Sequence, residues 1–399
     1  MNLVHSRRIV ALLGVLALAL AACSGGGAKD ATPTAPAPRV PPAASWEAAT
    51  QPGPFAVGVT TVEVVDTSRP TAANGSFPGS PERRMKVEVW YPAVPDASRA
   101  DGRDLTLDAS DAPYPLIVFA HGFTASRVQS TTYTRHLASH GYVVAAPDFP
   151  LTSGGAPGGP RIADLVNQPK DVSFVIDRML AFSDEDGNRF HGAIDAAHIG
   201  LTGHSLGAFT TILALYGPDR DPRIDAALPL SGSGCLLTPG ETQGVTTPVM
   251  FMIGSDDLIV APAGNRRAYD LAHAPRYWVE LVGGGHVRFA DADIDDARVL
   301  GPLQRVLSGG NGGASAGTPV SAPTPRAGDV TSCAFPAESP GDPPITLARQ
   351  QELLRAFATP FFDAYLRGSA DAERFLDDDL PALTKDAVKY EFDVGASGQ

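Results

Sequence analysis

Eight short runs of β-branched or continuously apolar residues recur along the middle of the chain, each bounded by turn residues. They lie at 60–66, 85–91, 115–120, 142–146, 198–202, 226–230, 248–253 and 276–282. Segments with helical spacing separate most of the later runs, at 131–140, 162–182, 206–216 and 264–272. Strands that alternate with helices predict βαβ units and a mostly parallel sheet with helices on both faces.

The two ends of this pattern add an edge and a closing helix. A polar segment joins the first two runs, which predicts an antiparallel hairpin at the edge of the sheet. Late in the chain, 346–367 carries apolar residues at helical spacing and stops at Gly368. We expect this segment to be a helix that packs back on the sheet.

The N-terminal residues have the pattern of an export signal. Arg7 and Arg8 precede the apolar run 9–20, which is shorter than the roughly 20 residues that span a bilayer. The run ends in the letters LAAC, which resemble a bacterial lipobox. We therefore predict that 1–22 is a lipoprotein signal peptide and that Cys23 is acylated, which would anchor an exported cell-envelope protein to a membrane. The alternative is an ordinary signal peptide followed by an incidental cysteine.

Glycine and proline are concentrated in two stretches. The chain has 399 residues with 41 Gly and 36 Pro, and 43% of it is hydrophobic, which excludes a disordered protein as a whole. The stretch 23–54 has few large apolar residues and predicts a flexible tether. The stretch 308–344 predicts a flexible insertion, which leaves 55–399 as a single domain.

The charge of the chain limits its partners. It has 31 Lys and Arg against 44 Asp and Glu, a formal net charge of −13, and no block of basic residues. Because an acidic surface repels phosphate backbones, we expect no nucleic-acid partner. We expect the protein to act as a monomer.

Two cysteines remain after the anchor is set aside. Cys235 and Cys333 belong to no CxxC motif and have no neighbouring metal ligands. Since disulfides form by default in exported proteins, we predict that they pair; the alternative is two isolated thiols.

One motif carries the chemistry of a nucleophile. Residues 203–207 read GHSLG, which matches G-x-S-x-G, and they follow a predicted strand and open a predicted helix. This is the context of a nucleophile elbow with Ser205 at its turn. A second copy, at 313–317, lies in the Gly/Pro-rich stretch with neither a strand before it nor a helix after it, so we do not expect it to function.

A serine nucleophile needs a base and an orienting acid. His286 lies directly after the last predicted strand, in a run of glycines that lets its loop reach back toward the serine. Two acids, Asp256 and Asp257, follow the strand 248–253, where an acid is expected in this order. The positions of the two acids alone leave both open.

Five segments of the chain have the form of a known family: VEVWYPA at 87–93, AHG at 120–122, LASHGYVV at 137–144, DVSFVID at 171–177 and the elbow at 203–207. Together they resemble the platelet-activating-factor acetylhydrolase and dienelactone-hydrolase-like branch of the α/β-hydrolases. The resemblance implies an α/β-hydrolase fold with an eight-stranded sheet. Cutinase-like polyester hydrolases are similar in the spacing of their serine, acid and histidine. A dienelactone hydrolase proper would carry cysteine where Ser205 stands.

The resemblance also implies roles for single residues. The family's Gly-x-x-Asp form selects Asp257 over Asp256 as the acid. The His-Gly loop would place the Phe123 N–H in the oxyanion hole beside the Leu206 N–H, which opens a helix. His121 would hold the loop as a structural residue, and the side chain of His204 would point away from the site.

The expected function is that of a serine carboxylic-ester hydrolase with an acyl-enzyme intermediate, which needs no cofactor and no metal. The short connection between the strands 226–230 and 248–253 leaves no room for a large cap domain, so we expect an open site walled by 151–160 and 232–244. Such a site suits lipid-like, short-acyl or polyester substrates. The alternatives are an acyltransferase or perhydrolase with the same residues, and a scaffold lipoprotein without turnover.

Four aspartates crowd together beyond His286. They are Asp291, Asp293, Asp295 and Asp296, and their number raises the possibility of calcium binding. Their spacing is not that of an EF-hand, so we predict a solvated loop.

Overall fold

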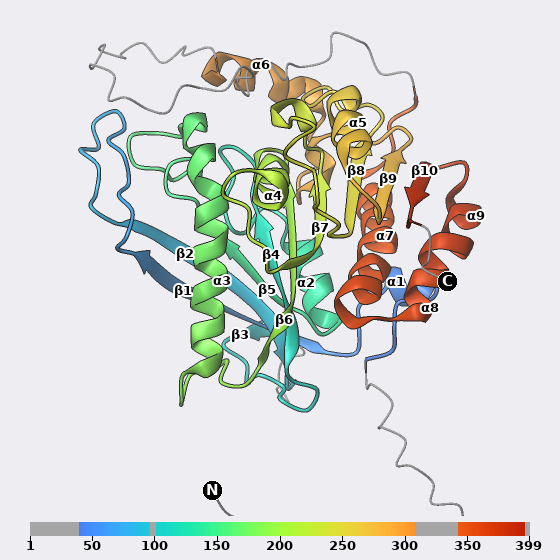
Figure 1. Ribbon diagram of the computed structural model, residues 1–399, viewed down its shortest axis with the longest axis horizontal. Coiled ribbons are helices and arrows are strands. Elements are labelled where there is room, and N and C mark those ends of the chain that lie inside the picture. The colour runs from blue at the N-terminus through green and yellow to red at the C-terminus, as the bar shows by residue number, and fades with distance from the viewer. Residues whose placement is uncertain (1–39, 96–100, 308–341, 396–399) are drawn as a thin grey trace, which may run out of the picture. The chain divides into compact units, whose positions relative to one another are not determined.

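Ten strands pair into one sheet in the computed structural model of the chain, which describes residues 40–95, 101–307 and 342–395. The order across the sheet is β10-β9-β8-β7-β6-β4-β5-β2-β1-β3, shown in Figure 1. The strands are β1 (Ala56–Asp66), β2 (Arg83–Ala93), β3 (Gly102–Arg103), β4 (Tyr114–Ala120), β5 (Val143–Pro147), β6 (Ile194–His204), β7 (Ile224–Leu230), β8 (Val249–Gly254), β9 (Arg276–Leu281) and β10 (Val388–Asp393).

All eight predicted strands form, and the sheet is mostly parallel. Strands β5, β4, β6, β7, β8 and β9 run parallel to their neighbours in this central block. The hairpin of β1 and β2 is antiparallel and joins the block through an antiparallel β2–β5 pair. The predicted antiparallel hairpin is therefore confirmed, although the two-residue β3, not the hairpin, forms the edge of the sheet.

Helices cover both faces of the sheet, as the sequence pattern predicts. One face packs against α3 (Gln168–Asp184), α4 (Leu206–Tyr216) and α5 (Pro262–Leu271). The other packs against α1 (Trp46–Thr50), α2 (Thr131–Ser139) and α7 (Leu347–Arg367). The remaining helices are η1 (Ile162–Asn167), η2 (Gly234–Leu236), η3 (Val287–Phe289), α6 (Asp296–Leu307), α8 (Ala370–Arg374), η5 (Phe375–Asp379) and α9 (Leu380–Thr384).

Strand β4 shows why a central strand reads as a continuous apolar run. Leu116 and Val118 enter the core on the side of α3, while Ile117 and Phe119 enter the core on the side of α7, and all four are fully buried. A strand covered on both faces has no polar side to alternate with.

The prediction of eight strands was two strands short. Strand β3 has only two residues, too few for any pattern, and it pairs with β1. Strand β10 pairs antiparallel with β9 at the opposite edge. Its residues VKYEFD are mostly polar or exposed, so only the pairing with β9 makes them a strand.

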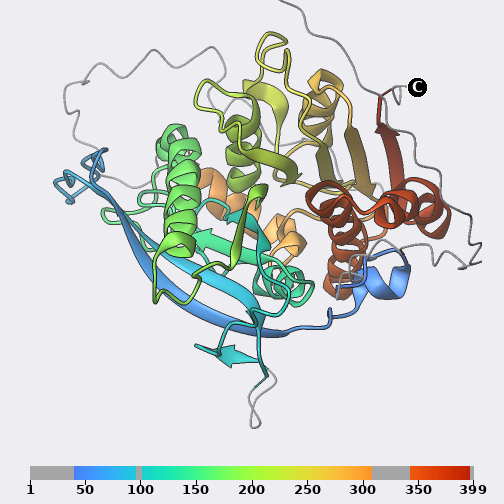
Figure 2. The same ribbon diagram turned by 60° about the horizontal axis from the view of Figure 1, so that its bottom comes forward.

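The predicted tether ends earlier than we expected. Within 23–54, Ala43 and Ala49 are fully buried, and Ser45 caps the short helix α1, which packs against α7 (Figure 2). The Ala43 N–H donates to the Asp363 carboxylate of α7 at 2.8 Å. Small residues that pack closely between helices carry little hydrophobicity in the sequence, which is why this segment was predicted to be a tether.

Every described residue belongs to one compact unit, Arg39–Gln399. The predicted signal peptide, Cys23 and almost all of the predicted insertion 308–344 lie outside the described residues. Within the described ranges, no helix has the length and hydropathy that crossing a membrane requires.

Candidate active site

Ser205 lies at the sharp turn between β6 and α4. Its φ of 57° and ψ of −120° fall where non-glycine residues are rare. Its amide donates to the Leu230 carbonyl at the end of β7, at 2.9 Å. The turn therefore stands at the carboxyl ends of the central strands, as a nucleophile elbow does.

Gly207 lets the elbow pack directly against β4. A Cβ at this position would lie 1.9 Å from the carbonyl oxygen of Ala120, a distance that no side chain can occupy. The close approach brings the first turn of α4 to the start of the loop that follows β4. The second G-x-S-x-G copy, 313–317, lies outside the described residues.

Asp257 and His286 meet through a hydrogen bond, although they come from different loops after β8 and β9. Nδ1 of His286 lies 2.8 Å from Oδ2 of Asp257, and both side chains are almost completely buried. The other carboxylate oxygen, Oδ1, accepts the amides of Ile259 at 2.8 Å and Val260 at 2.7 Å. The carboxylate is thus fixed from both sides, and it holds the imidazole with its proton on Nδ1.

Glycines allow these two loops to touch. A Cβ at Gly254, the last residue of β8, would lie 2.1 Å from the carbonyl oxygen of Gly284 in the loop of His286. Only a residue without a side chain permits this contact. The glycine run before His286 is therefore used to bring the histidine against the acid loop.

Asp256 takes a different position from Asp257. Its amide donates to the Gly284 carbonyl at 2.9 Å, and its carboxylate accepts the Ser255 hydroxyl at 3.2 Å. Its Oδ2 is buried without a hydrogen-bond partner in the part of the chain that is described. Of the two candidate acids, Asp257 is the one that contacts His286.

The surroundings of His286 favour its protonated form. Burial by itself lowers the pKa of this imidazole, but the charge and hydrogen bond of Asp257, with a further contribution from Asp296, raise it above the usual 6.5. A raised pKa makes His286 a stronger base near neutral pH.

The resemblance implied that the side chain of His204 points away from the site, and the structure shows that it does not. Its ring lies against the ring of His286 with 4.6 Å between the centroids, and its Nε2 donates to the His286 carbonyl at 2.9 Å. Burial holds the pKa of His204 well below its usual value, so it remains a neutral donor. His204, which precedes Ser205, thus connects the loop of His286 to the elbow through this hydrogen bond.

The ring of His286 lies against His204, the residue before Ser205, but no hydrogen bond joins Ser205 to His286 in the described part of the chain. Among the described residues, neither the Ser205 hydroxyl nor Nε2 of His286 has a hydrogen-bond partner. In ligand-free hydrolases this contact is often longer than a hydrogen bond and tightens when substrate binds.

Two backbone amides close to Ser205 in the chain or in space have no hydrogen-bond acceptor among the described residues. The loop after β4 runs close to the elbow, since a Cβ at Gly122 would lie 3.2 Å from the Cβ of Ser205. The amides of Phe123 in this loop and Leu206 at the start of α4 find no acceptor within the described ranges. Unpaired amides at a helix N-terminus and an adjacent loop can bind an oxyanion.

Gln129 connects the loop after β4 to the elbow, and the sequence analysis missed it. Its Oε1 accepts the Gly122 amide at 2.6 Å, and its Nε2 donates to Nδ1 of His204. One side chain therefore fixes the amide next to Phe123 and the ring that contacts His286. No sequence signal marked Gln129, because a glutamine just before a helix is common.

His121 holds the loop after β4, as the resemblance implied. It is fully buried, its Nδ1 donates to the Gly122 carbonyl at 2.8 Å, and its Nε2 accepts the Phe149 amide at 3.1 Å. Burial lowers the pKa of His121, so the ring stays neutral and can donate from one nitrogen while it accepts at the other. The same loop is tied to the segment after β5, since the Thr124 amide donates to the Thr152 carbonyl at 2.9 Å.

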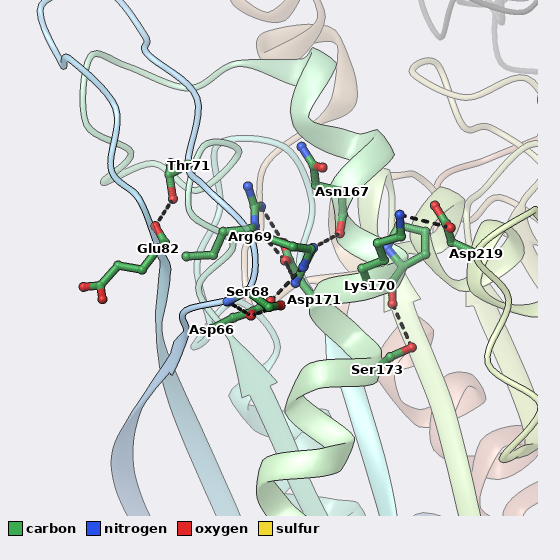
Figure 3. Close-up of polar contacts among 12 residues, drawn as sticks. Asp66, Ser68, Arg69, Thr71, Glu82, Asn167, Lys170, Asp171, Ser173 and Asp219 are labelled. Carbon is green, nitrogen blue, oxygen red and sulfur yellow. Dashed lines mark hydrogen bonds and ion pairs between the residues drawn. The ribbon is translucent and has the colours of Figure 1, made fainter. Parts of the chain in front are cut away.

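A buried ion cluster holds the start of α3, whose first residue, Gln168, donates to the Thr152 hydroxyl. Arg83 is 1% exposed and bonds Asp164 of η1 at 2.8 Å and Asp171 of α3 at 2.6 Å. Figure 3 shows Arg69, from the β1–β2 connection, bonded to Asp171 on the same helix. The hairpin thereby fixes η1 and α3 beside the site.

An apolar cluster surrounds the elbow. Leu206 and Phe209 of α4 pack with Leu165 of η1 and with Ile259 and Val260 of the acid loop. Partly exposed apolar side chains extend this cluster: Phe123, Ile162, Leu213, Cys235, Leu236, Val287 and Val299. The connection between β7 and β8 contains only the three-residue η2 and no cap domain.

The remaining predicted sites give mixed results. Within the described ranges, no group of His, Cys, Asp or Glu side chains is arranged to hold a metal ion. Cys333 lies outside the described residues, so its pairing with Cys235 stays a prediction. Of the four aspartates beyond His286, Asp296 is buried rather than solvated, which corrects the prediction for that residue.

The sheet, its two helical layers and the elbow at its centre define an α/β-hydrolase fold. Residues 96–154 match the family model of platelet-activating factor acetylhydrolase, isoform II. A ferulic acid esterase from Streptomyces cinnamoneus has a similar solved structure, with a TM-score of 0.55 and 24% identity over 84% of this chain and 93% of that one. The similar structure confirms the expected α/β-hydrolase fold, and the match to the acetylhydrolase family model supports the class of carboxylic ester hydrolases.

Proposed function

We propose that the protein is a serine carboxylic-ester hydrolase in which Ser205, His286 and Asp257 form the catalytic triad. The observation that carries the proposal is the buried Asp257–His286 hydrogen bond at 2.8 Å beside the strained turn of Ser205. The two unpaired amides of Phe123 and Leu206 add a site for the oxyanion.

The reaction begins when Nε2 of His286 takes the hydroxyl proton of Ser205 as the oxygen attacks the ester carbonyl. The amides of Phe123 and Leu206 stabilise the tetrahedral oxyanion, and Asp257 stabilises the imidazolium. The imidazolium then gives its proton to the departing alcohol, which leaves an acyl-enzyme. Water, deprotonated by the same imidazole, releases the carboxylic acid and restores the serine.

The substrate class follows from the apolar cluster around the elbow. Leu165, Phe209 and Ile259 belong to the apolar cluster that also contains Leu206, the residue after Ser205. Apolar walls stabilise apolar acyl or alcohol groups and penalise charged ones, because a buried charge without a partner is costly. We therefore propose neutral, apolar esters of the short-acyl, lipid-like or polyester kind.

Hydrolysis of p-nitrophenyl esters of increasing acyl length tests the proposal. Ser205→Ala should lose about 10⁴-fold or more in kcat, while the acyl series should favour uncharged apolar chains. Ser315→Ala, in the second G-x-S-x-G copy, is the matched control and should retain activity. A wild-type protein that hydrolyses none of these esters would refute the function, and an active Ser205→Ala would refute the nucleophile.

We further propose that the enzyme acts outside the cytoplasm, anchored through a lipid on Cys23, with a Cys235–Cys333 disulfide. The lipobox-like sequence supports the anchor, and an oxidising compartment supports the bond. Mass spectrometry of the mature protein tests both, through a diacylglyceryl mass on Cys23 and a two-hydrogen increase on reduction. A Cys23→Ser variant that still partitions with membranes would contradict the anchor.

A further inference from the structure

Asp296 differs from the other aspartates of its loop. It is the first residue of α6 and is 6% exposed, whereas the side chains of Asp293 and Asp295 are 72% and 60% exposed and pair with Arg288. A carboxylate is rarely buried without several donors to compensate for the loss of water.

Three backbone amides supply those donors. Oδ2 of Asp296 accepts the His286 amide at 2.7 Å and the Leu258 amide at 3.2 Å. Oδ1 accepts the Val287 amide at 2.9 Å. Hydrogen bonds to a charged acceptor are among the stronger ones in proteins.

These amides belong to two different loops. Leu258 follows Asp257 directly, while Val287 follows His286, so one carboxylate fixes the backbone next to both members of the acid–base pair. The contact is close: a Cβ at Gly285 would lie 3.3 Å from Oδ1 of Asp296. A backbone bond from the Asp256 amide to the Gly284 carbonyl also joins these two loops, and the Asp296 carboxylate adds three bonds at the residues of the acid–base pair and directly after them.

The groups that face His286 come from several elements. Asp257 bonds its ring, the ring of His204 in the elbow lies against it at a tilt of 47°, and Asp296 bonds its backbone from α6. Arg288 lies two residues further along the loop, paired with exposed aspartates. The charge of Asp296 acts on His286 in the same direction as that of Asp257.

We propose that Asp296 is a positioning residue. It fixes the loops of His286 and Asp257 relative to each other through hydrogen bonds from three backbone amides. The inference rests on the proposed ester hydrolase function for its kinetic test, but the geometry itself can be tested without activity. Asp296 touches no reacting atom, so it sets the placement of the base rather than taking part in proton transfer.

Asp296→Asn tests the proposal, with Asp293→Asn as the matched control in the same loop. The amide keeps the shape but replaces one acceptor oxygen with a donor, which cannot bond to a backbone N–H. We expect kcat for a p-nitrophenyl ester to fall about 10- to 100-fold with KM changed less than about 3-fold, because a small misplacement of the base affects the transition state most. Asp293→Asn should stay within about 2-fold of wild type, since its side chain lies in water.

A second readout does not depend on turnover. The pKa of His286, followed by NMR of ring-labelled histidine and assigned with His286→Ala, should fall by about 0.5 pH unit or more in Asp296→Asn and stay unchanged in Asp293→Asn. Asp296→Glu keeps the charge but displaces the amides, so it should lose kcat while its His286 pKa stays near that of wild type. If Asp296→Asn does not fold, the kcat and the His286 pKa of Asp296→Glu test the proposal instead.

Rates and a His286 pKa in Asp296→Asn that match wild type would overturn the proposal. If the wild-type protein hydrolyses no ester, the proposed function fails, and the NMR titration still decides whether Asp296 controls His286. The two failures can therefore be told apart.

Discussion

Oδ2 of Asp257 lies 2.8 Å from Nδ1 of His286, and both side chains are buried between the loops that follow β8 and β9. The neighbouring Asp256 makes no such contact and bonds Ser255 instead. Two adjacent carboxylates thus have separate surroundings, and this difference leads to the first prediction.

Asp257→Asn should lower kcat/KM about 10⁴-fold, because an amide in place of the carboxylate favours the wrong imidazole tautomer and no longer stabilises the imidazolium. Asp256→Asn, with the same change of charge one residue away, should lose less than about 10-fold. Steady-state kinetics on a p-nitrophenyl ester measures both. Equal losses, or the reverse order, would exchange the roles of the two acids.

The acid side of the pH profile should report His286. Burial lowers its pKa, but the charge and hydrogen bond of Asp257 outweigh burial and raise the pKa above 6.5. Since the base must be neutral to accept a proton, kcat/KM should fall as pH drops through a midpoint above 6.5, with the slope of one proton. His204 should add no second proton, because its pKa is well below the usual value. A midpoint below 6.5 would contradict the assignment.

Gln129→Met should lower kcat by about 10- to 100-fold, with a small change in KM. The substitution keeps the volume but removes the bonds to the Gly122 amide and to His204, so the adjacent Phe123 amide loses its fixed position. Gln51→Met, at an exposed glutamine, is the control and should be neutral. Wild-type kcat in Gln129→Met would show that the oxyanion loop holds its geometry without this side chain.

Arg83→Met should destabilise the protein by about 3–5 kcal/mol, because it leaves Asp164 and Asp171 buried without their principal cation. Arg84→Met is the matched control, since Arg84 follows Arg83 on the surface and pairs with the exposed Glu63 and the half-buried Glu82. Urea unfolding followed by circular dichroism measures the difference. Equal urea midpoints for the two variants would mean that the ion cluster of Arg83, Asp164 and Asp171 does not stabilise the start of α3. Figure 3 shows the neighbouring bond from Arg69 to Asp171.

Asp377→Asn should stabilise the protein above pH 6. Burial raises the pKa of this carboxyl to about 6, above its value in an unfolded chain, although Tyr277 donates to it at 3.1 Å. Because the folded state then binds more protons between about pH 4 and 6, stability declines as pH rises through that window. The asparagine removes this decline, so its urea midpoint should exceed that of wild type at pH 8 and approach it at pH 4. Asp378→Asn, at an exposed neighbour, should show no such pH dependence.

Local patterns were enough for the sheet and the elbow. Eight strands and the main helices could be predicted because each carries its own signal: a doubly buried strand such as β4 is apolar throughout, and α7 repeats its apolar residues at helical spacing. The G-x-S-x-G turn could be predicted because its five residues stand together in the chain, at the end of a strand and the start of a helix. These features depend on neighbours in the chain.

The parts that the sequence did not reveal depend on distant partners. The mostly polar β10 is a strand because β9 offers it an edge, and the segment around Ala43 belongs to the fold because α7 provides a surface and a carboxylate. Asp296 and Gln129 look like ordinary polar residues until folding brings backbone amides to them.

The amino-acid sequence by itself determined the order of the eight central strands and the main helices, the turn at Ser205 and a short set of candidate bases and acids. The tertiary structure decided which carboxylate contacts His286, which residues clamp its loop, and that the ring of His204 lies against it. The physical reason is that the role of a buried polar group depends on the hydrogen-bond donors and acceptors that surround it. Those groups come from loops far apart in the chain, and only the packed sheet brings them together.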